Sequence, residues 1–319
     1  MHDSSSKGLG ILCRNLYLGA NFKLLLPAAT NLRLGQLAAN FYRFVTLSNY
    51  PERAKYLARE IATRKPEVVC LQEVYEYVLP DHGERLDFLS LLLNELGEDS
   101  GYSVACCETA TSVELPIWWK GKAGRLKVTD QIVILVSTEV AIESHGSEQY
   151  SDKIPIPMPF AGHQDETVLD VRRAFQWIDM TWENTQLRIA NTHLESISEE
   201  IQSKQALELI CKMEKSGRER ILVGDLNAEP GKLVYHLFTC RPGDYSDPFK
   251  DGENTWGTGD HTGEEFMDNR QRIDHILHTE NIVSRSTEVF GYRPEERTLP
   301  GKLFPSDHAG LMAVFGMAV

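Results

Sequence analysis

The chain has 319 residues, of which 42% are hydrophobic and 25% are charged, the usual balance of a globular protein. Its net charge of −13 argues against a protein held on nucleic acid by a broad basic surface, although a nuclease that touches its substrate briefly is compatible with it. No segment approaches the ~18 consecutive apolar residues of a membrane span, and the first residues show no signal peptide. We therefore expect a cytoplasmic protein, or a secreted one if the sequence is a mature form.

The six cysteines include no CxxC pair, and four of them lie inside apolar runs. This pattern is typical of buried small hydrophobic residues in a reducing compartment, and it disfavours a disulfide framework. Without clustered thiolates, a structural zinc site is not expected either. The chain shows no internal repeat and no low-complexity tract.

The N-terminal part predicts a strand followed by an unusual apolar segment. Residues 8–18 read as a first strand in which Asn15 interrupts an apolar run. Apolar residues at helical spacing then mark an inserted helical segment at about 22–49. This segment is either a helical hairpin packed on the core or a lid or lipid-facing element, because it directly follows the strand that carries Asn15.

A helix, a strand and another helix are expected next. Tyr50-Pro51 opens the first helix, with proline in its first turn. Residues 67–71 predict a buried strand that ends at Glu73, and leucines at helical spacing over 86–96 predict the second helix. A carboxylate at the end of a buried strand has no structural use, so Glu73 is a candidate functional residue.

Strands are expected over 102–107 and 130–136, with a loop between them. This loop holds the local cationic and aromatic cluster of an acidic chain: Trp118, Trp119, Lys120, Lys122, Arg125 and Lys127. The cluster either binds a polyanion or stacks a base, or it is an ordinary hairpin surface. A second, Pro- and Asp-rich irregular loop is expected over 147–170.

A pair of strands and a helix follow. The strands are expected over 171–182 and 186–193, and the second ends at His193. Ser196 with Glu199 fits a capping box for the helix after it.

The stretch Ile221–Pro230, ILVGDLNAEP, is the strongest local sign of a functional site. An apolar run that ends in Gly-Asp predicts a buried strand with polar side chains at its C-terminal end. Residues two apart on a strand share a face, so Asp225 and Asn227 can converge on one ligand. The alternative is an Asx turn at a strand end. Other apolar runs carry polar residues in the same way: Asn15, Glu73, His193, Asp274, Asp307 and His308.

These groups suit phosphoester hydrolysis by a metal-activated water. Glu73, helped by Asp307, offers hard oxygen ligands for Mg²⁺ or Mn²⁺. Asp225 could orient and deprotonate the attacking water. His308 paired with Asp274 would be a fixed imidazole beside the phosphate. Three further residues could hold phosphoryl oxygens where negative charge develops: Asn15, Asn227 and His193.

Five short motifs resemble those of the endonuclease/exonuclease/phosphatase superfamily, the DNase I-like proteins. They occur in that family's order and span nearly the whole chain: QE at 72–73, NTHL at 191–194, GDLN at 224–227, RIDHI at 272–276 and SDH at 306–308. The N-terminal NLYLGAN, the helical insertion and YPERAKYLAREI further resemble a bacterial-type branch of the superfamily that is known mainly as hypothetical members. Many members of that branch are secreted, a feature that this N-terminus does not support.

The resemblance implies a four-layer αββα sandwich of two mixed β-sheets flanked by helices, in a single domain over residues 1–319. It implies Mg²⁺ or Mn²⁺ as cofactor, with Glu73 as the principal metal ligand and Asn15 beside it. Arg173 occupies a place where relatives often carry a basic residue, which makes it a candidate for substrate binding. The resemblance also implies the roles given above for the remaining site residues: Asp225, Asn227, His193, His308 and Asp274. The tyrosine that abasic-site nucleases place in the site has no clear match, and no basic DNA-binding loop is evident.

Three functions follow as hypotheses. The first is a divalent-metal phosphodiesterase that acts on nucleic acid, because that substrate is common in the superfamily. The second is a lipid-directed enzyme, sphingomyelinase-like or an inositol-phosphate phosphatase, which the apolar insertion and the negative charge favour. The third is a non-catalytic binding module on the same fold, against which the intact set of acidic residues and histidines argues. No obligate protein partner is evident from the sequence.

Overall fold

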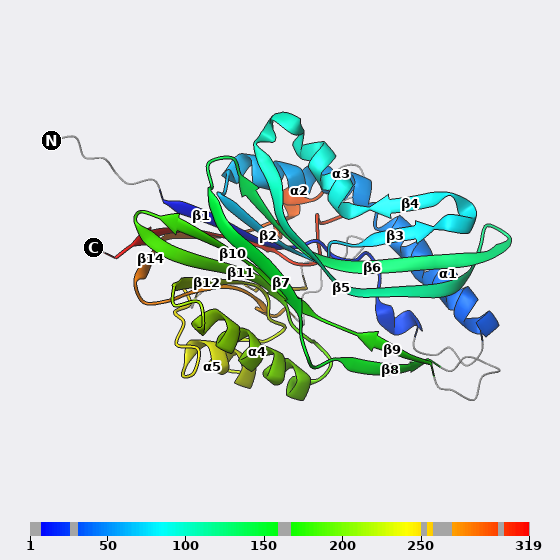
Figure 1. Ribbon diagram of the computed structural model, residues 1–319. Helices are drawn as coiled ribbons and strands as arrows, with labels where there is room; N and C mark the ends of the chain where they lie inside the picture. The colour runs from blue at the N-terminus through cyan, green and yellow to red at the C-terminus, as the bar shows by residue number, and fades with distance from the viewer. Residues whose placement is uncertain are drawn as a thin grey trace.

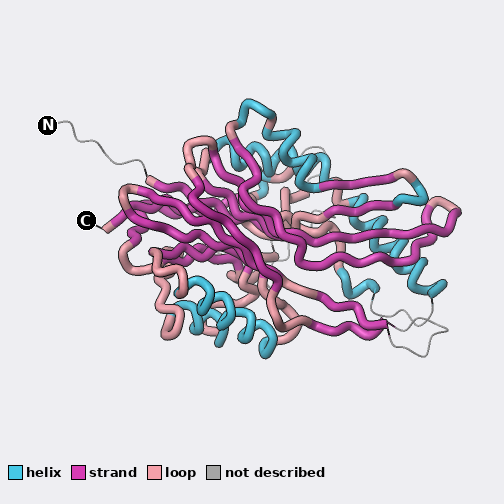
Figure 2. The backbone as a smooth tube through the Cα atoms, viewed as in Figure 1, coloured by secondary structure: helices cyan, strands magenta, loops and turns pink. Residues whose placement is uncertain are grey.

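The computed structural model describes residues 8–25, 31–158, 167–249, 254–257, 270–298 and 303–318. Two β-sheets lie face to face, and helices cover their outer faces (Figures 1 and 2). Both sheets are mixed, because β1 runs parallel to β2 in one and β11 runs parallel to β12 in the other, among antiparallel neighbours. The predicted αββα sandwich is confirmed.

The larger sheet has eight strands. Its spatial order is β14 (Ile282–Phe290), β15 (Gly310–Met317), β1 (Leu9–Asn15), β2 (Val68–Gln72), β6 (Lys122–Ser137), β3 (Glu76–Leu79) and β4 (Glu84–Asp87). The remaining strand, β5 (Tyr102–Trp119), pairs with β6 along its whole length. The β5–β6 hairpin extends the sheet to the right in Figure 1, where β3, β4 and α1 accompany it.

The smaller sheet has five strands. Its spatial order is β13 (Asp274–His278), β12 (Glu219–Asp225), β11 (Thr185–His193), β10 (Ala174–Trp182) and β7 (Ile142–Gln149). A separate two-stranded sheet pairs β8 (Ile154–Met158) with β9 (Thr167–Val171).

Helices form the outer layers. The larger sheet is covered by α1 (Asn31–Leu47), α2 (Tyr50–Arg64) and α3 (Phe88–Leu96), and the smaller sheet by α4 (Glu199–Glu214) and α5 (Leu233–Thr239). Single 3₁₀ turns are η1 (Phe22–Leu25), η2 (Pro80–His82), η3 (Glu98–Ser100) and η4 (Pro294–Glu296). Within the described ranges, no helix is long and apolar enough to cross a membrane.

The expected helical insertion at about 22–49 contains η1 and α1. The side chains of Leu34, Ala38, Phe41 and Val45 recur at helical spacing and are buried in the core beneath the larger sheet. Residues 26–30, between the two helical pieces, lie outside the described part of the chain.

Two predicted loops are wrong. Residues 118–127 belong to the β5–β6 hairpin, whose pairing continues to Trp119 opposite Lys122, with a turn at Lys120-Gly121. The stretch 147–170 contains the end of β7 and both strands of the small sheet, although 159–166 lie outside the described residues. In both cases a partner strand supplies the hydrogen bonds, and a local pattern does not reveal that partner.

Two helix starts also differ from the prediction. Ser198 caps α4, because its Oγ accepts a hydrogen bond from the amide of Ile201 at 3.3 Å, so Ser196 is not the cap. Helix α3 begins at Phe88, capped by Asp87, and Leu86 belongs to β4 instead.

Candidate active site

The period of two along the strands carries polar residues into the layer between the sheets. On β1 the side chains of Leu9, Ile11 and Cys13 pack in the core between the sheets, and Asn15 continues the same face. The same alternation places a candidate site residue on the inner face of each of three strands in the smaller sheet: His193 on β11, Asp225 on β12 and Asp274 on β13.

Strand register then brings these residues side by side. His193 lies opposite Asp225 in the parallel pair of β11 and β12, and Asp274 lies opposite Asp225 in the antiparallel pair of β12 and β13. In the larger sheet, Asn15 lies opposite Gln72, so Glu73 follows directly beside it. The two sheets therefore present their polar residues to each other at one end of the sandwich.

Asp225 is the centre of the cluster. Its Oδ2 accepts a hydrogen bond from Nδ2 of Asn15 at 3.1 Å and lies 3.5 Å from Nε2 of His193 and 3.9 Å from Nε2 of His308. Its Oδ1 accepts from the backbone amide of Asn227 at 2.9 Å. Burial is the main cause that raises the pKa of Asp225 to about 7, and the charge of Asp274 adds to it.

His308 and Asp274 form a close pair. Nδ1 of His308 lies 2.8 Å from Oδ2 of Asp274, and its Nε2 faces Asp225 and Asp307. Burial lowers the pKa of His308, but the charges of Asp274 and Asp307 outweigh burial and raise that pKa to about 10. The imidazole is therefore protonated at neutral pH. Burial raises the pKa of Asp307 to about 6, against the opposing charge of His308.

His193 is a neutral imidazole held by Arg173. Nη1 of Arg173 lies 3.0 Å from Nδ1 and 3.2 Å from Nε2 of His193. A guanidinium has no acceptor, so a ring nitrogen of His193 must accept, which requires the unprotonated ring. If Nδ1 accepts, Nε2 keeps its proton and points it toward Asp225. Burial lowers the pKa of His193 well below its usual value, and Arg173 lowers it further.

Glu73 is fixed by an unusual backbone conformation. Its φ of +53° lies in the left-handed region, which costs a non-glycine residue about 1–2 kcal/mol. One carboxylate oxygen accepts from the amide of Leu18 at 2.6 Å, so the chain after β1 holds this side chain. Asn227 also has a positive φ, of +50°, and its Nδ2 donates to the carbonyl of Leu194 at 3.0 Å. Strained backbone of this kind often marks functional sites.

Two buried carboxylates belong to this site although the sequence analysis did not single them out. Oδ2 of Asp130 lies 3.8 Å and Oε2 of Glu195 lies 3.7 Å from Arg173. Burial raises the pKa of Asp130 to about 7, against the charge of Arg173. A sequence signal existed, because Asp130 opens the apolar run DQIVILV and Glu195 directly follows NTHL. Tyr75 borders the same region, since the charges of Asp130 and Glu73 add to the effect of burial in raising its pKa.

The donor set fits a hard divalent cation. Four carboxylates, Glu73, Asp225, Asp274 and Asp307, share the region with one protonated imidazole, and Oδ1 of Asp274 is buried without a hydrogen-bond partner in the described part of the chain. Potential ligand atoms of Asp225, Asp274 and His308 lie within 4.8 Å of one another. A protonated imidazole has no lone pair to offer, so the carboxylate oxygens are the better donors, and these suit Mg²⁺ or Mn²⁺.

A sandwich of two mixed sheets with acidic residues and histidines gathered between the strand ends defines a DNase I-like protein. The sequence profile of the Endonuclease/Exonuclease/phosphatase family matches residues 30–308, and the chain belongs to this family. No curated protein sequence matches the chain.

Solved structures of low sequence identity share the fold over nearly the full length. An endonuclease/exonuclease/phosphatase from Bacteroides vulgatus has a TM-score of 0.61 at 15% identity, covering 98% of this chain and 100% of its own. The mannosyl-6-phosphatase of Bacteroides thetaiotaomicron has a TM-score of 0.60 at 17% identity, covering 97% and 100%. The catalytic domain of human Nocturnin with a bound sulfate anion has a TM-score of 0.55 at 18% identity, covering 98% and 96%. At these identities the similarity concerns the fold alone.

Proposed function

We propose that this protein is a divalent-metal-dependent phosphoester hydrolase. The observation that carries the proposal is the convergence of Asn15, His193 and His308 on one oxygen of Asp225. A buried carboxylate whose pKa is raised to about 7 is matched to accepting a proton from water near neutral pH. The contact from Asn15 orients this carboxylate, so Asp225 would activate the water that attacks phosphorus.

In this proposal Glu73, Asp307 and Asn15 hold the metal ion. The cation, when bound, supplies positive charge that offsets the charge of the phosphoryl group in the transition state. Oδ1 of Asn15 accepts from the amide of Tyr17 at 2.9 Å, so the Asn15 side chain is held rigidly between that amide and Asp225. Such preorganisation lowers the cost of ordering the site during the reaction.

The remaining groups bind the phosphoryl oxygens. In the tautomer whose Nδ1 accepts from Arg173, Nε2 of His193 donates one hydrogen bond, with a phosphoryl oxygen replacing Asp225 as the acceptor. Asn227 keeps one amide hydrogen after donating the other to the carbonyl of Leu194. Arg173 binds substrate through its charge and by orienting His193. The imidazolium of His308, held by Asp274, places a further positive charge beside the phosphate.

Asp225→Asn tests the proposal. Plasmid DNA, single-stranded DNA, RNA, sphingomyelin and inositol phosphates would each be incubated with the protein in Mg²⁺ or Mn²⁺, and again with a chelator. We expect metal-dependent turnover of one substrate class and a decrease of about 10²–10⁴-fold in kcat for the variant, the usual contribution of a general base. The exposed Asp99→Asn is the matched control and keeps wild-type activity.

Two outcomes would contradict the proposal. Turnover that survives in Asp225→Asn at the wild-type rate would remove Asp225 from the chemistry. Binding of a phosphoester without turnover, together with no affinity for Mn²⁺ in a calorimetric titration, would favour the non-catalytic binding module.

Nucleic acid is the first substrate class proposed, and the affinity for it would come from the site itself. Two cations of the cluster on the β5–β6 hairpin are paired with acidic neighbours: Lys120 lies 2.7 Å from Glu84, and Arg125 lies 3.2 Å from Asp81. The net charge of −13 opposes the approach of a long polyanion. A nuclease built this way would contact few phosphates and show a weak dependence on salt.

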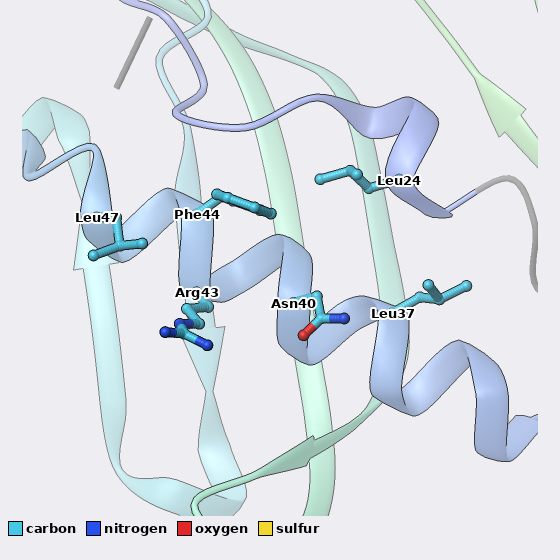
Figure 3. Close-up of a pocket in the computed structure, with 6 residues that line it drawn as sticks. All are labelled: Leu24, Leu37, Asn40, Arg43, Phe44 and Leu47. Atoms are coloured by element: carbon cyan, nitrogen blue, oxygen red, sulfur yellow. The ribbon is translucent and has the colours of Figure 1, made fainter. Parts of the chain in front are cut away.

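A lipid or inositol phosphoester is the second candidate, and a groove on the insertion favours it. The groove has a volume of about 420 Å³ and runs along α1 beside η1 (Figure 3). It is lined by Leu24, Leu37, Asn40, Arg43, Phe44 and Leu47. Leu47 is 52% exposed, so the helix presents apolar surface to solvent as well as to the core. In the substrate panel, turnover of sphingomyelin rather than of nucleic acid would favour this candidate.

A further inference from the structure

Helix α2 carries a buried arginine that has no role in the chemistry proposed above. Arg53 is 1% exposed, and its guanidinium donates hydrogen bonds to backbone carbonyls of three separate segments. The acceptors are Ser48 at 3.0 Å, Leu16 at 2.7 Å, Tyr17 at 3.1 Å and Pro305 at 2.9 Å. One side chain thus ties together the start of α2, the chain after β1 and the chain before β15.

Aromatic rings fix the guanidinium in this position. Its Cζ lies 4.9 Å from the ring centroid of Tyr50, 5.3 Å from that of Tyr17 and 5.9 Å from that of Phe88. A planar guanidinium stacks on rings and offers several donors in a fixed fork, which the point charge of a lysine cannot reproduce. Arg53 is therefore held rigidly while it binds the three segments.

A second contact from α2 reaches the chain before β15. Glu60 lies seven residues after Arg53, on the same face of the helix, and accepts from Nε and Nη2 of Arg14 at 3.0 and 3.1 Å. Nη1 of Arg14 donates to the carbonyl of His308. Gly291 leaves room for this pair, because a Cβ there would lie 2.7 Å from both Arg14 and Glu60.

The chain after β1 that Arg53 binds is the one that holds two site residues. Leu16 directly follows Asn15 on the chain, and the amide of Tyr17 donates to Oδ1 of Asn15 at 2.9 Å. The amide of Leu18 donates to Glu73 at 2.6 Å. A shift of residues 16–18 would therefore move the side chains of both Asn15 and Glu73.

The chain before β15 carries two further site residues, Asp307 and His308. The carbonyls of Pro305 and His308, bound by Arg53 and Arg14, lie on either side of Asp307. We propose that Arg53 is a positioning residue that sets the distance between the 16–18 loop and the 305–308 loop, with Arg14 as a second tie. The inference rests on the proposed function because that function gives the two loops their role in catalysis. The hydrogen bonds from Arg53 to the loops are independent of any substrate.

Arg53→Lys tests this inference, because lysine keeps the positive charge but lacks the planar set of N–H donors of the guanidinium. The exposed Arg59→Lys on the same helix is the matched control. We expect kcat to fall by about tenfold to a hundredfold, the effect of a misplacement of roughly 1 Å, with KM within about threefold of wild type. Hydrogen exchange measured by mass spectrometry should become faster in residues 16–18 and 303–308, and remain unchanged in β11 and β12. Arg59→Lys should match wild type in both measurements.

Wild-type exchange rates in both loops of Arg53→Lys would overturn the inference. A loss of activity that only follows the loss of folded protein, measured by thermal unfolding, would also overturn it. If the wild-type protein turns over no substrate in the panel, the proposed function fails, and the exchange measurement alone decides whether the tie exists.

Glu60→Gln keeps the inference testable if Arg53→Lys does not fold. This change weakens only the contact between Glu60 of α2 and Arg14. Hydrogen exchange should therefore become faster in residues 303–308 and stay unchanged in residues 16–18. Unchanged exchange in 303–308 would reject Arg14 as the second tie.

Discussion

Arg173 lies among buried carboxylates and a buried histidine beside the candidate site. Its guanidinium faces the carboxylates of Asp130 and Glu195 at 3.8 and 3.7 Å and donates to the neutral ring of His193. The side chains of Arg173 and Asp130 are 13% and 8% exposed. Charges this buried are tolerated only while they are paired, so the cluster depends on each of its members.

Arg173→Met should destabilise the protein by about 3 kcal/mol, because two buried carboxylates lose their counter-charge. Urea denaturation measures the difference in the free energy of unfolding. Arg59→Met is the control, since Arg59 is exposed on α2 and its guanidinium lies over the ring of Tyr56. Adding Asp130→Asn to Arg173→Met should recover part of the stability. A double variant whose losses simply add would show that Arg173 and Asp130 are not coupled.

At the scale of the elements, the parallel strands β11 and β12 carry two candidate site residues, His193 and Asp225. Gly224 allows the two strands to lie close together. Gly224 lies opposite Thr192 and directly before Asp225, with a φ of +152°. A Cβ at this position would lie 2.0 Å from the carbonyl oxygen of Thr192. That oxygen belongs to the backbone of a buried neighbouring strand, so it has no room to move aside.

Gly224→Ala should therefore lower both stability and turnover. We expect a loss of about 1–3 kcal/mol in the free energy of unfolding, as for other overpacked sites, and a lower kcat because Asp225 moves with its strand. Gly217→Ala is the control, because Gly217 also has a positive φ, of +65°, but an added Cβ would meet open space. Equal losses for the two variants, measured by urea denaturation, would show that backbone conformation and not the contact with Thr192 is decisive.

At the scale of the whole molecule, part of the positive charge on the extended hairpin is paired within the fold. Lys120 and Arg125 are paired with acidic side chains of the β3–β4 region, and Lys122 donates to the carbonyl of Asp81. The chain as a whole carries a net charge of −13.

Neutralising the hairpin should leave catalysis intact. For a nucleic-acid substrate, the triple variant Lys120→Gln, Lys122→Gln, Arg125→Gln should keep KM within about twofold of wild type and leave its dependence on salt unchanged. Each phosphate contact contributes a slope of roughly −0.7 to −0.9 in a plot of log affinity against log salt. A higher KM with a shallower salt dependence would instead identify the hairpin as a phosphate-binding surface.

Much of this arrangement could be predicted from the sequence. The alternation of Leu9, Ile11 and Cys13 predicts the inward face on which Asn15 lies, and the same period places Asp225 in β12. The order of the short motifs indicated the family, which the profile match confirms. The loop predicted between residues 107 and 130 was wrong, because pairing between β5 and β6 overrides a local pattern that lacks strong periodicity.

The sequence by itself determined the polar residues at the ends of apolar runs, because strand period is a local property. Its five short motifs indicated the family, and the two-sheet fold was expected because that resemblance implies it. Only the tertiary structure decided how those residues are charged and held. The tie from Arg14 to His308 joins residues 294 positions apart, and the tie from Arg53 to Pro305 spans 252. The protonated His308 and the neutral His193 differ because of the charges that the fold packs around each ring. Contacts over such separations arise from packing, and a local pattern in the chain contains no record of them.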